Sequence, residues 1–156
     1  MPRQRLLPLL LLAAVACEES SPTVFRPSEP EQPLESIPGI LVAPTMLKSG
    51  DLFIELVGVQ TMLFTELVGA EVLIDGVFDE SDGALLIHEF MVLTVDNLPA
   101  VDGRLEETDE GFAVYPRYGP AVALAEIPGD LEDDVGKRVW LTLQDGFPVR
   151  YGVLEM

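Results

Sequence analysis

The sequence has little of what most catalytic and metal sites are built from. Its 156 residues include one Cys, one His and one Trp. A single Cys excludes an internal disulfide framework, and one Cys with one His excludes a zinc cluster made from these side chains. The patterns Gly-x-Ser-x-Gly, His-Glu-x-x-His and Gly-x-x-x-x-Gly-Lys are also missing. We therefore expect no cofactor, no metal site and no enzyme activity.

Basic residues are scarce as well. Nine Lys and Arg stand against 27 Asp and Glu, which gives a formal net charge of -18. A chain this acidic is repelled by phosphate backbones, so we expect no nucleic-acid partner. The acidic clusters at 79–82, 106–110 and 132–134 lack the spacing of a calcium-binding EF-hand loop and are typical of solvated surface. Hydrophobic residues nevertheless make up 48% of the chain, enough to form a core.

No hydrophobic run is long enough to span a membrane, and the longest run lies near the N-terminus. The first sixteen residues contain Arg3 and Arg5, followed by an apolar run from Leu6 to Ala16 that only Pro8 interrupts. A helix of that length spans roughly 16 Å, whereas a bilayer core is about 30 Å thick. We therefore expect residues 1–16 to be a signal peptide that is removed, which would change the net charge from -18 to -20.

The residues Ala14-Val15-Ala16-Cys17 resemble the lipobox of bacterial lipoproteins. The resemblance implies that Cys17 becomes the lipidated first residue of the mature chain. Two or more acyl chains would anchor it stably, since each buried CH₂ contributes roughly 0.8 kcal/mol. In enterobacterial members of this family an Asp after the Cys favours inner-membrane retention. Glu18 stands there instead, so the resemblance implies the periplasmic face of the outer membrane. The alternative is an ordinary signal peptide that is cleaved after Ala16.

Residues 17–37 are expected to form a disordered tether behind the lipid anchor. The stretch EESSPTVFRPSEPEQPLESI is rich in Glu, Pro and Ser and has neither helical nor strand periodicity. Proline and like charges stiffen such segments. We expect this tether to hold the following domain away from the lipid surface.

From residue 38 onward, short apolar runs alternate with turn residues at intervals of about ten residues, as in all-β proteins. We predict strands at 40–43, 51–57, 71–78, 84–95, 103–107, 112–115, 121–126, 138–143 and 149–154. The expected turn dipeptides are Asp75-Gly76, Asp82-Gly83, Asp102-Gly103, Glu110-Gly111 and Asp145-Gly146. Segments 63–68 and 130–135 are each typical of one helical turn.

A pattern of the form Val-Gly-x-x-Val occurs twice, at 68–72 and at 135–139. Superposing the two copies without gaps matches Leu86 with Val153 and Ile87 with Leu154. Upstream, Gly39 and Leu41 can be matched with Gly103 and Leu105. The pattern indicates either an internal duplication or a chance recurrence of a common turn.

Each copy would contain three strands, a short helix and two more strands, an order that resembles the OB-fold, a small five-stranded barrel. We predict an all-β protein with two OB-like barrels in tandem, at 38–101 and 102–156. The second shows the pattern more clearly, because the expected third strand of the first, 58–62, is short and poorly patterned. A single β-sandwich or one larger barrel is the alternative.

Aromatic and basic residues provide the candidate binding surface. OB-folds often bind ligands on a face of this kind. The candidates for contact with a partner are Tyr115, Arg117, Tyr118, Arg150 and Tyr151. Trp140 is expected in the core. His88 should share a strand face with Leu86 and Phe90, as a half-buried or rim residue paired with a carboxylate.

These features together predict a lipid-anchored protein of the cell envelope that works by binding. A partner protein with a basic surface would complement the acidic domain. One alternative is a periplasmic carrier of a small ligand or divalent metal. Another is an enzyme that uses surface carboxylates.

Overall fold

The computed structural model describes residues 33–155, and these confirm the all-β prediction. They form ten strands, one short α-helix and one 3-10 helix. No helix within residues 33–155 is long and apolar enough to cross a membrane. The expected signal peptide, Cys17 and most of the expected tether lie outside the described residues. The first strand begins at Glu35, so residues 35–37 belong to the sheet and not to the tether.

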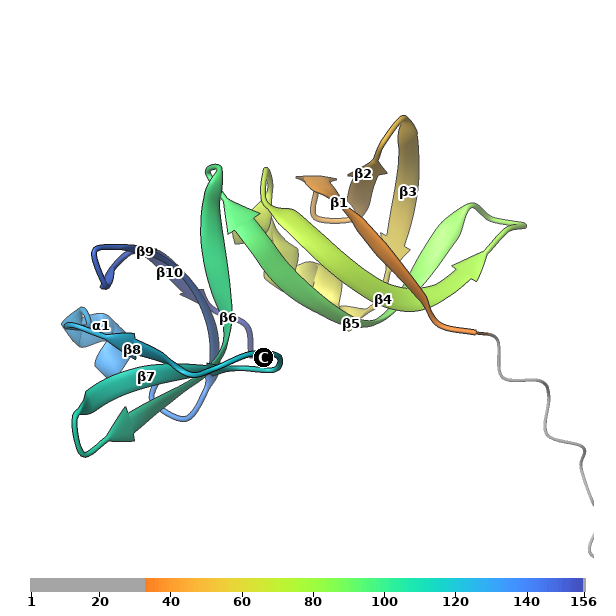
Figure 1. Ribbon diagram of the computed structural model, residues 1–156. Helices are drawn as coiled ribbons and strands as arrows, with labels where there is room; N and C mark the ends of the chain where they lie inside the picture. Colours follow the sequence, from red (N-terminus) through yellow and green to blue (C-terminus); the bar gives the residue numbers. More distant parts are fainter. Residues whose placement is uncertain (1–32, 156) are drawn as a thin grey trace, which may run out of the picture. The chain divides into compact units, whose positions relative to one another are not determined.

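The first half of the fold is a closed five-stranded barrel. Its elements are β1 (Glu35–Ala43), β2 (Met46–Ser49), β3 (Leu52–Val57), η1 (Val59–Leu67), β4 (Glu71–Asp79) and β5 (Ala84–Val95). The strands pair in the order β1-β2-β3-β5-β4, and β4 returns to β1. The parallel pairing of β3 with β5 completes the ring, which has the strand order of an OB-fold (Figure 1).

The second half repeats this order but stays open. Its elements are β6 (Leu98–Thr108), β7 (Gly111–Pro116), β8 (Val122–Leu124), α1 (Gly129–Glu132), β9 (Arg138–Gln144) and β10 (Phe147–Val153). Strand β6 pairs with β7 and β9, β7 pairs with β8, and β9 pairs with β10. No strand pairing joins β8 to β10 within the described residues. The closed barrel is therefore the first half, although the sequence pattern was clearer in the second.

Hairpin length explains this difference. Val72 of β4 pairs with Val92, twenty residues later, whereas the equivalent Val139 of β9 pairs with Val153, fourteen residues later. The longer hairpin supplies Ala84 and, next to it, Leu85, which are two of the three β5 residues that pair with β3. In the second half the chain has already turned at this point.

The backbone contacts of the two halves correspond closely. The amide of Gly69 donates to the carbonyl of Leu41 at 2.7 Å, and the amide of Gly136 donates to the carbonyl of Leu105 at the same distance. These are the pairs that the upstream sequence match predicts. The downstream match is wrong: Val153 corresponds to Val92 and not to Leu86, because the two hairpins differ by six residues.

A bulge recurs at the same place in both halves. Asp75 pairs with Glu89 and the next residue of β4 pairs with Ile87, so the bulge skips His88. In the β9–β10 hairpin the equivalent shift skips Val149. A bulge reverses the inside-outside alternation of a strand. His88 is therefore exposed while Phe90 is buried, and the expectation that these two residues share a face is wrong.

Three local predictions also fail. Asp75-Gly76 and Asp102-Gly103 are not turns but lie inside β4 and β6. Segment 58–62 is not a strand, because residues 59–62 form the first part of η1; the missing strand is β2 at Met46–Ser49. Gly103 is required for close packing, because a Cβ atom there would lie 2.3 Å from the carbonyl oxygen of Tyr115.

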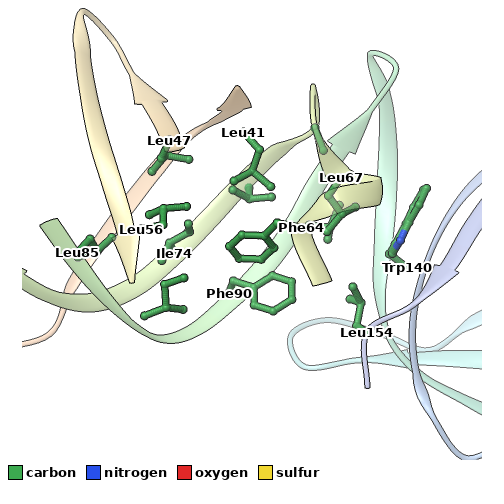
Figure 2. Packing of buried hydrophobic residues seen from close by; sticks show 14 of the residues in the cluster. Leu41, Leu47, Leu56, Phe64, Leu67, Ile74, Leu85, Phe90, Trp140 and Leu154 are labelled. Atoms are coloured by element: carbon green, nitrogen blue, oxygen red, sulfur yellow. The ribbon is translucent and has the colours of Figure 1, made fainter. Parts of the chain in front are cut away.

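Two hydrophobic clusters stabilise the fold. The larger one fills the first barrel around Phe64 and Phe90, whose rings meet edge to face with centroids 4.8 Å apart. Trp140 of β9 and Leu154 belong to this cluster although they come from the second half (Figure 2). Trp140 is buried, which confirms it as a core residue. The smaller cluster lies within the second half around Leu131 and Leu141.

Candidate functional site: a cleft between the two halves

A cleft of about 380 Å³ lies where the two halves meet. Strands β4 and β5 line it from the first half. From the second half it is lined by β6, β7, the loop after β7, β9 and Glu155, which follows β10. Other hollows have similar volumes, such as one of about 410 Å³ around Ile40 and Lys48, but their lining comes from one half alone. This cleft contains three of the side chains that the sequence predicts as contact residues: Tyr115, Arg117 and Tyr118.

An ion pair forms one wall of the cleft and joins the two halves. Arg138 of β9 donates from Nε and Nη2 to the two carboxylate oxygens of Asp102 on β6, both at 2.8 Å. Asp102 also accepts the backbone amide of Val92 at 2.8 Å, and Arg138 donates to the carbonyl of Phe90. The Arg138 guanidinium lies over the Phe90 ring, 4.7 Å from its centroid.

This ion pair replaces strand pairing that the backbone cannot make. Strands β5 and β6 pair only through Thr94 with Pro99 and Val95 with Leu98, and then diverge. Phe90 and Val92 lie further from the β5–β6 turn than these pairs. The Val92 amide and the Phe90 carbonyl are on the edge of β5 that faces β6, since strand residues two apart point the same way. Their backbone groups would stay unpaired without Asp102 and Arg138, and a buried unpaired group costs about 1–3 kcal/mol.

The mouth of the cleft holds an exposed arginine. Arg117, in the loop between β7 and β8, forms an ion pair with Glu89 of β5. Its guanidinium also lies 5.4 Å from the ring centroid of Tyr118. Tyr118 and, in β7, Tyr115 are 69% and 44% exposed, so both rings are open to a ligand. The first half supplies the carboxylate and the second half supplies the arginine.

Carboxylates outnumber cations in the lining. It contains Asp75, Glu89, Asp102 and Glu155 against Arg104, Arg117 and Arg138. Within residues 33–155, Asp75 and Glu155 form no ion pair with a lysine or arginine. Asp75 accepts the Ser36 hydroxyl, and Glu155 accepts the backbone amide of Arg138. Within residues 33–155, Asp75 therefore faces the cleft without an ion-pair partner, whereas Glu155 interacts electrostatically with Lys137.

The structure brings together three of the five predicted contact residues. Tyr115, Arg117 and Tyr118 line the cleft, whereas Arg150 and Tyr151 do not. Arg150 forms an ion pair with Asp96 at the β5–β6 turn. The Tyr151 hydroxyl donates to Asp130 at 2.8 Å, and this hydrogen bond raises the pKa of Tyr151.

Asp102, Arg138 and Glu89 are site residues that the sequence analysis missed. Asp102 was assigned to a turn because a Gly follows it, and nothing in the local sequence distinguishes that dipeptide from a turn. The available signal was that Asp102 is flanked by residues that fit a strand and that Arg138 lies on a later strand. A charged residue within a strand needs a partner if it is buried.

The cleft presents groups that can bind a ligand. Asp75 and Glu89 are neighbours on adjacent strands of one sheet and do not face each other across the cleft. Within residues 33–155 no group of three or more His, Cys, Asp or Glu side chains is arranged to hold a metal ion. The groups available to a ligand are carboxylates, tyrosine rings and an apolar surface that includes Leu73 and Met91.

Comparisons with protein-family models, with curated proteins and with solved structures gave no match.

Proposed function

We propose that this protein is a lipid-anchored protein of the bacterial cell envelope that binds a cationic partner in the cleft between its two halves. One observation supports the binding role above others: Tyr115, Arg117 and Tyr118, the contact residues expected from the sequence, line one cleft together with four carboxylates. Tyrosine is enriched where proteins contact one another, because its ring is apolar and its hydroxyl can form hydrogen bonds.

Charge supports a cationic partner. The net charge of -18 attracts positive groups over long distances and raises their rate of association. Asp75 offers a local charge that forms no ion pair with a lysine or arginine of residues 33–155. An envelope protein with a basic segment is the partner that fits these charges.

The proposed anchor is the lipidated Cys17, with outer-membrane location at the periplasmic face. Mass spectrometry of the mature N-terminus, after expression in a host with two membranes, tests it. We expect a chain that begins at Cys17 and has the added mass of its acyl groups. A mature chain with an unmodified Cys17 would refute the anchor and leave the cleft proposal standing.

Titration of the detergent-solubilised protein with defined peptides tests the binding role. We expect the peptide acetyl-Arg-Leu-Arg-Leu-Arg-amide to bind, with affinity that falls as salt is added, and its Glu counterpart not to bind. Replacing Tyr115 and Tyr118 by Ala should weaken binding about fivefold or more. Tyr151→Ala is the matched control, because Tyr151 lies outside the cleft. Equal weakening by both changes would contradict binding in the cleft.

A carrier of a small ligand is the second candidate. A volume of about 380 Å³ lies within the range of small-molecule sites, about 300–1,000 Å³. Native mass spectrometry of the protein purified from its own host separates the two candidates. A retained small molecule, together with no response to the arginine peptide, would favour the carrier.

A further inference from the structure

We propose that Arg117 occupies the cation position of the cleft in the free protein and is displaced by an arginine side chain of the bound partner. The proposal rests on the binding function above and names the group that the cleft recognises, a guanidinium. It also assigns Arg117 a role as an internal competitor, not as a contact for the ligand.

Glu89 lies in an electrostatic setting that favours a nearby cation. Glu89 and Asp75 are directly opposite each other on antiparallel strands β5 and β4. Like charges at such positions repel each other and destabilise the sheet. A cation beside them relieves this repulsion, and Arg117 provides one by pairing with Glu89. This part of the sheet therefore favours a positive group whether it comes from the chain or from a partner.

The groups around Arg117 are those that bind a guanidinium. The guanidinium has a carboxylate as its partner and an aromatic ring, Tyr118, 5.4 Å from it. A carboxylate together with an aromatic ring is the environment that binds arginine well, because the planar group pairs with one and stacks on the other. The internal contact thus shows which chemistry the position accepts.

Arg117 can leave its ion pair with Glu89 at a low cost in free energy. Its side chain is 54% exposed and that of Glu89 is 42% exposed. Ion pairs with this exposure contribute about 0–1 kcal/mol. Arg117 also comes from a loop, between Pro116 and Val122, and not from a strand. Arg138 provides the contrast, because the carboxylate that it binds is 2% exposed.

The cleft has room for the rest of a partner beside Arg117. The cleft extends past Glu89 to Asp75, Glu155 and an apolar surface. An arginine that replaced Arg117 would bring neighbouring residues onto this surface. A peptide with arginines next to apolar residues satisfies both the charges and the apolar lining.

The test compares Arg117→Ala with Arg150→Ala in peptide binding. Arg150 is the matched control, since it too is an exposed arginine in an ion pair, and both variants change the net charge equally. If Arg117 competes with the peptide, Arg117→Ala should bind acetyl-Arg-Leu-Arg-Leu-Arg-amide about two- to fivefold more tightly than the wild type. Arg150→Ala should match the wild type. Weaker binding by Arg117→Ala would overturn the proposal, and so would an equal gain in both variants.

A double-mutant cycle locates the competition. Glu89→Gln should weaken peptide binding, and in that background Arg117→Ala should give no further gain, because the shared carboxylate is gone. A gain that persists in the Glu89→Gln background would refute competition for Glu89. The same peptide with citrulline in place of arginine should bind about tenfold or more weakly, since it keeps the shape and loses the charge.

The outcomes separate this inference from the proposed function. Binding by the wild type that weakens in Arg117→Ala would leave the function standing and remove the competitor role. No binding of the peptide by the wild type or by Arg117→Ala would overturn both. Arginine amide, tested alongside, distinguishes a peptide partner from a free guanidinium compound: equal affinity for both probes would favour the small compound as the ligand.

Discussion

The closed first half and the open second half of this protein solve the same packing problem differently. The first half seals its barrel through β3 and β5 and encloses a core that reaches Phe64 and Leu85. The second half has no such seal, and two of its buried side chains, Trp140 and Leu154, pack into the core of the first. Closure is thus not needed for stability when a neighbouring core takes up part of the apolar surface. The cleft lies at the junction that this dependence creates.

Trp140→Ala should have the largest effect on this relationship. Trp140 is 3% exposed and belongs to the core of the first half, and truncating such a residue costs about 3–5 kcal/mol. We expect urea denaturation followed by circular dichroism to show this loss. Hydrogen exchange should also become faster in both halves.

Leu131→Ala is the control for that experiment, since Leu131 lies in the cluster of the second half alone. It should be destabilising too, but with faster exchange confined to β6–β10. If Trp140→Ala also affected only the second half, the two halves would be energetically independent, and the second half would not depend on the core of the first.

Asp102→Asn tests the ion pair at the junction. The amide oxygen can still accept from Val92, but Arg138 loses its charged partner, which we expect to cost about 2–3 kcal/mol. Asp96→Asn is the control, because it removes the exposed pair with Arg150 and should cost less than about 0.5 kcal/mol. Equal effects of the two changes in urea denaturation would show that the junction does not depend on Asp102.

Gly152→Ala probes how tightly Trp140 is held. A Cβ atom at Gly152 would lie 2.6 Å from Nε1 of Trp140, so the indole must shift away from its place in the core of the first half. Overpacking of this kind costs about 1–3 kcal/mol, and we expect about 1–2 here. The thermal midpoint and the near-ultraviolet dichroism of the indole measure it. Gly129→Ala, whose Cβ position lies in open space, should leave the indole signal unchanged and should not lower the thermal midpoint.

The sequence predicted the fold class better than it predicted closure. Alternation of apolar residues gave most of the strands, and the paired Val-Gly-x-x-Val segments marked equivalent contacts at Gly69 and Gly136. Closure depends on where a hairpin turns, and a difference of six residues has no signature in local periodicity. The bulges at His88 and Val149 could not be predicted from the sequence either, because a bulge is defined only by the pairing of its strand with another strand.

The candidate site was half predictable for a related reason. Tyr115, Arg117 and Tyr118 lie close together in the chain, so composition alone could group them. Glu89 and Asp102 reach the cleft only through the tertiary fold, and no local rule relates them to Arg117 or Arg138. Gly103 shows how a local rule misleads: the glycine serves a close approach to β7, while its dipeptide has the composition of a turn.

Pro148→Val should have the smallest effect on stability, and it tests whether proline contributes to the open barrel beside the short hairpin. One hydrogen bond of the missing β8–β10 pairing is present, from the Ala125 amide to the Gly146 carbonyl at 3.0 Å. In a parallel pair the Ala125 carbonyl would next accept from the amide of residue 148, which proline lacks.

Valine at this position restores that donor. The new hydrogen bond would contribute about 0.5–1.5 kcal/mol, and losing proline's restriction of the unfolded chain would offset about 0.4–1 kcal/mol of it, so we expect a net change below about 1 kcal/mol. Hydrogen exchange measured by NMR is the sensitive readout, with the amides of residues 148 and Ala125 becoming more protected. If residue 148 exchanged as fast as the exposed turn at Asp145, proline would not be what holds the barrel open, and the short hairpin alone would account for the difference between the halves.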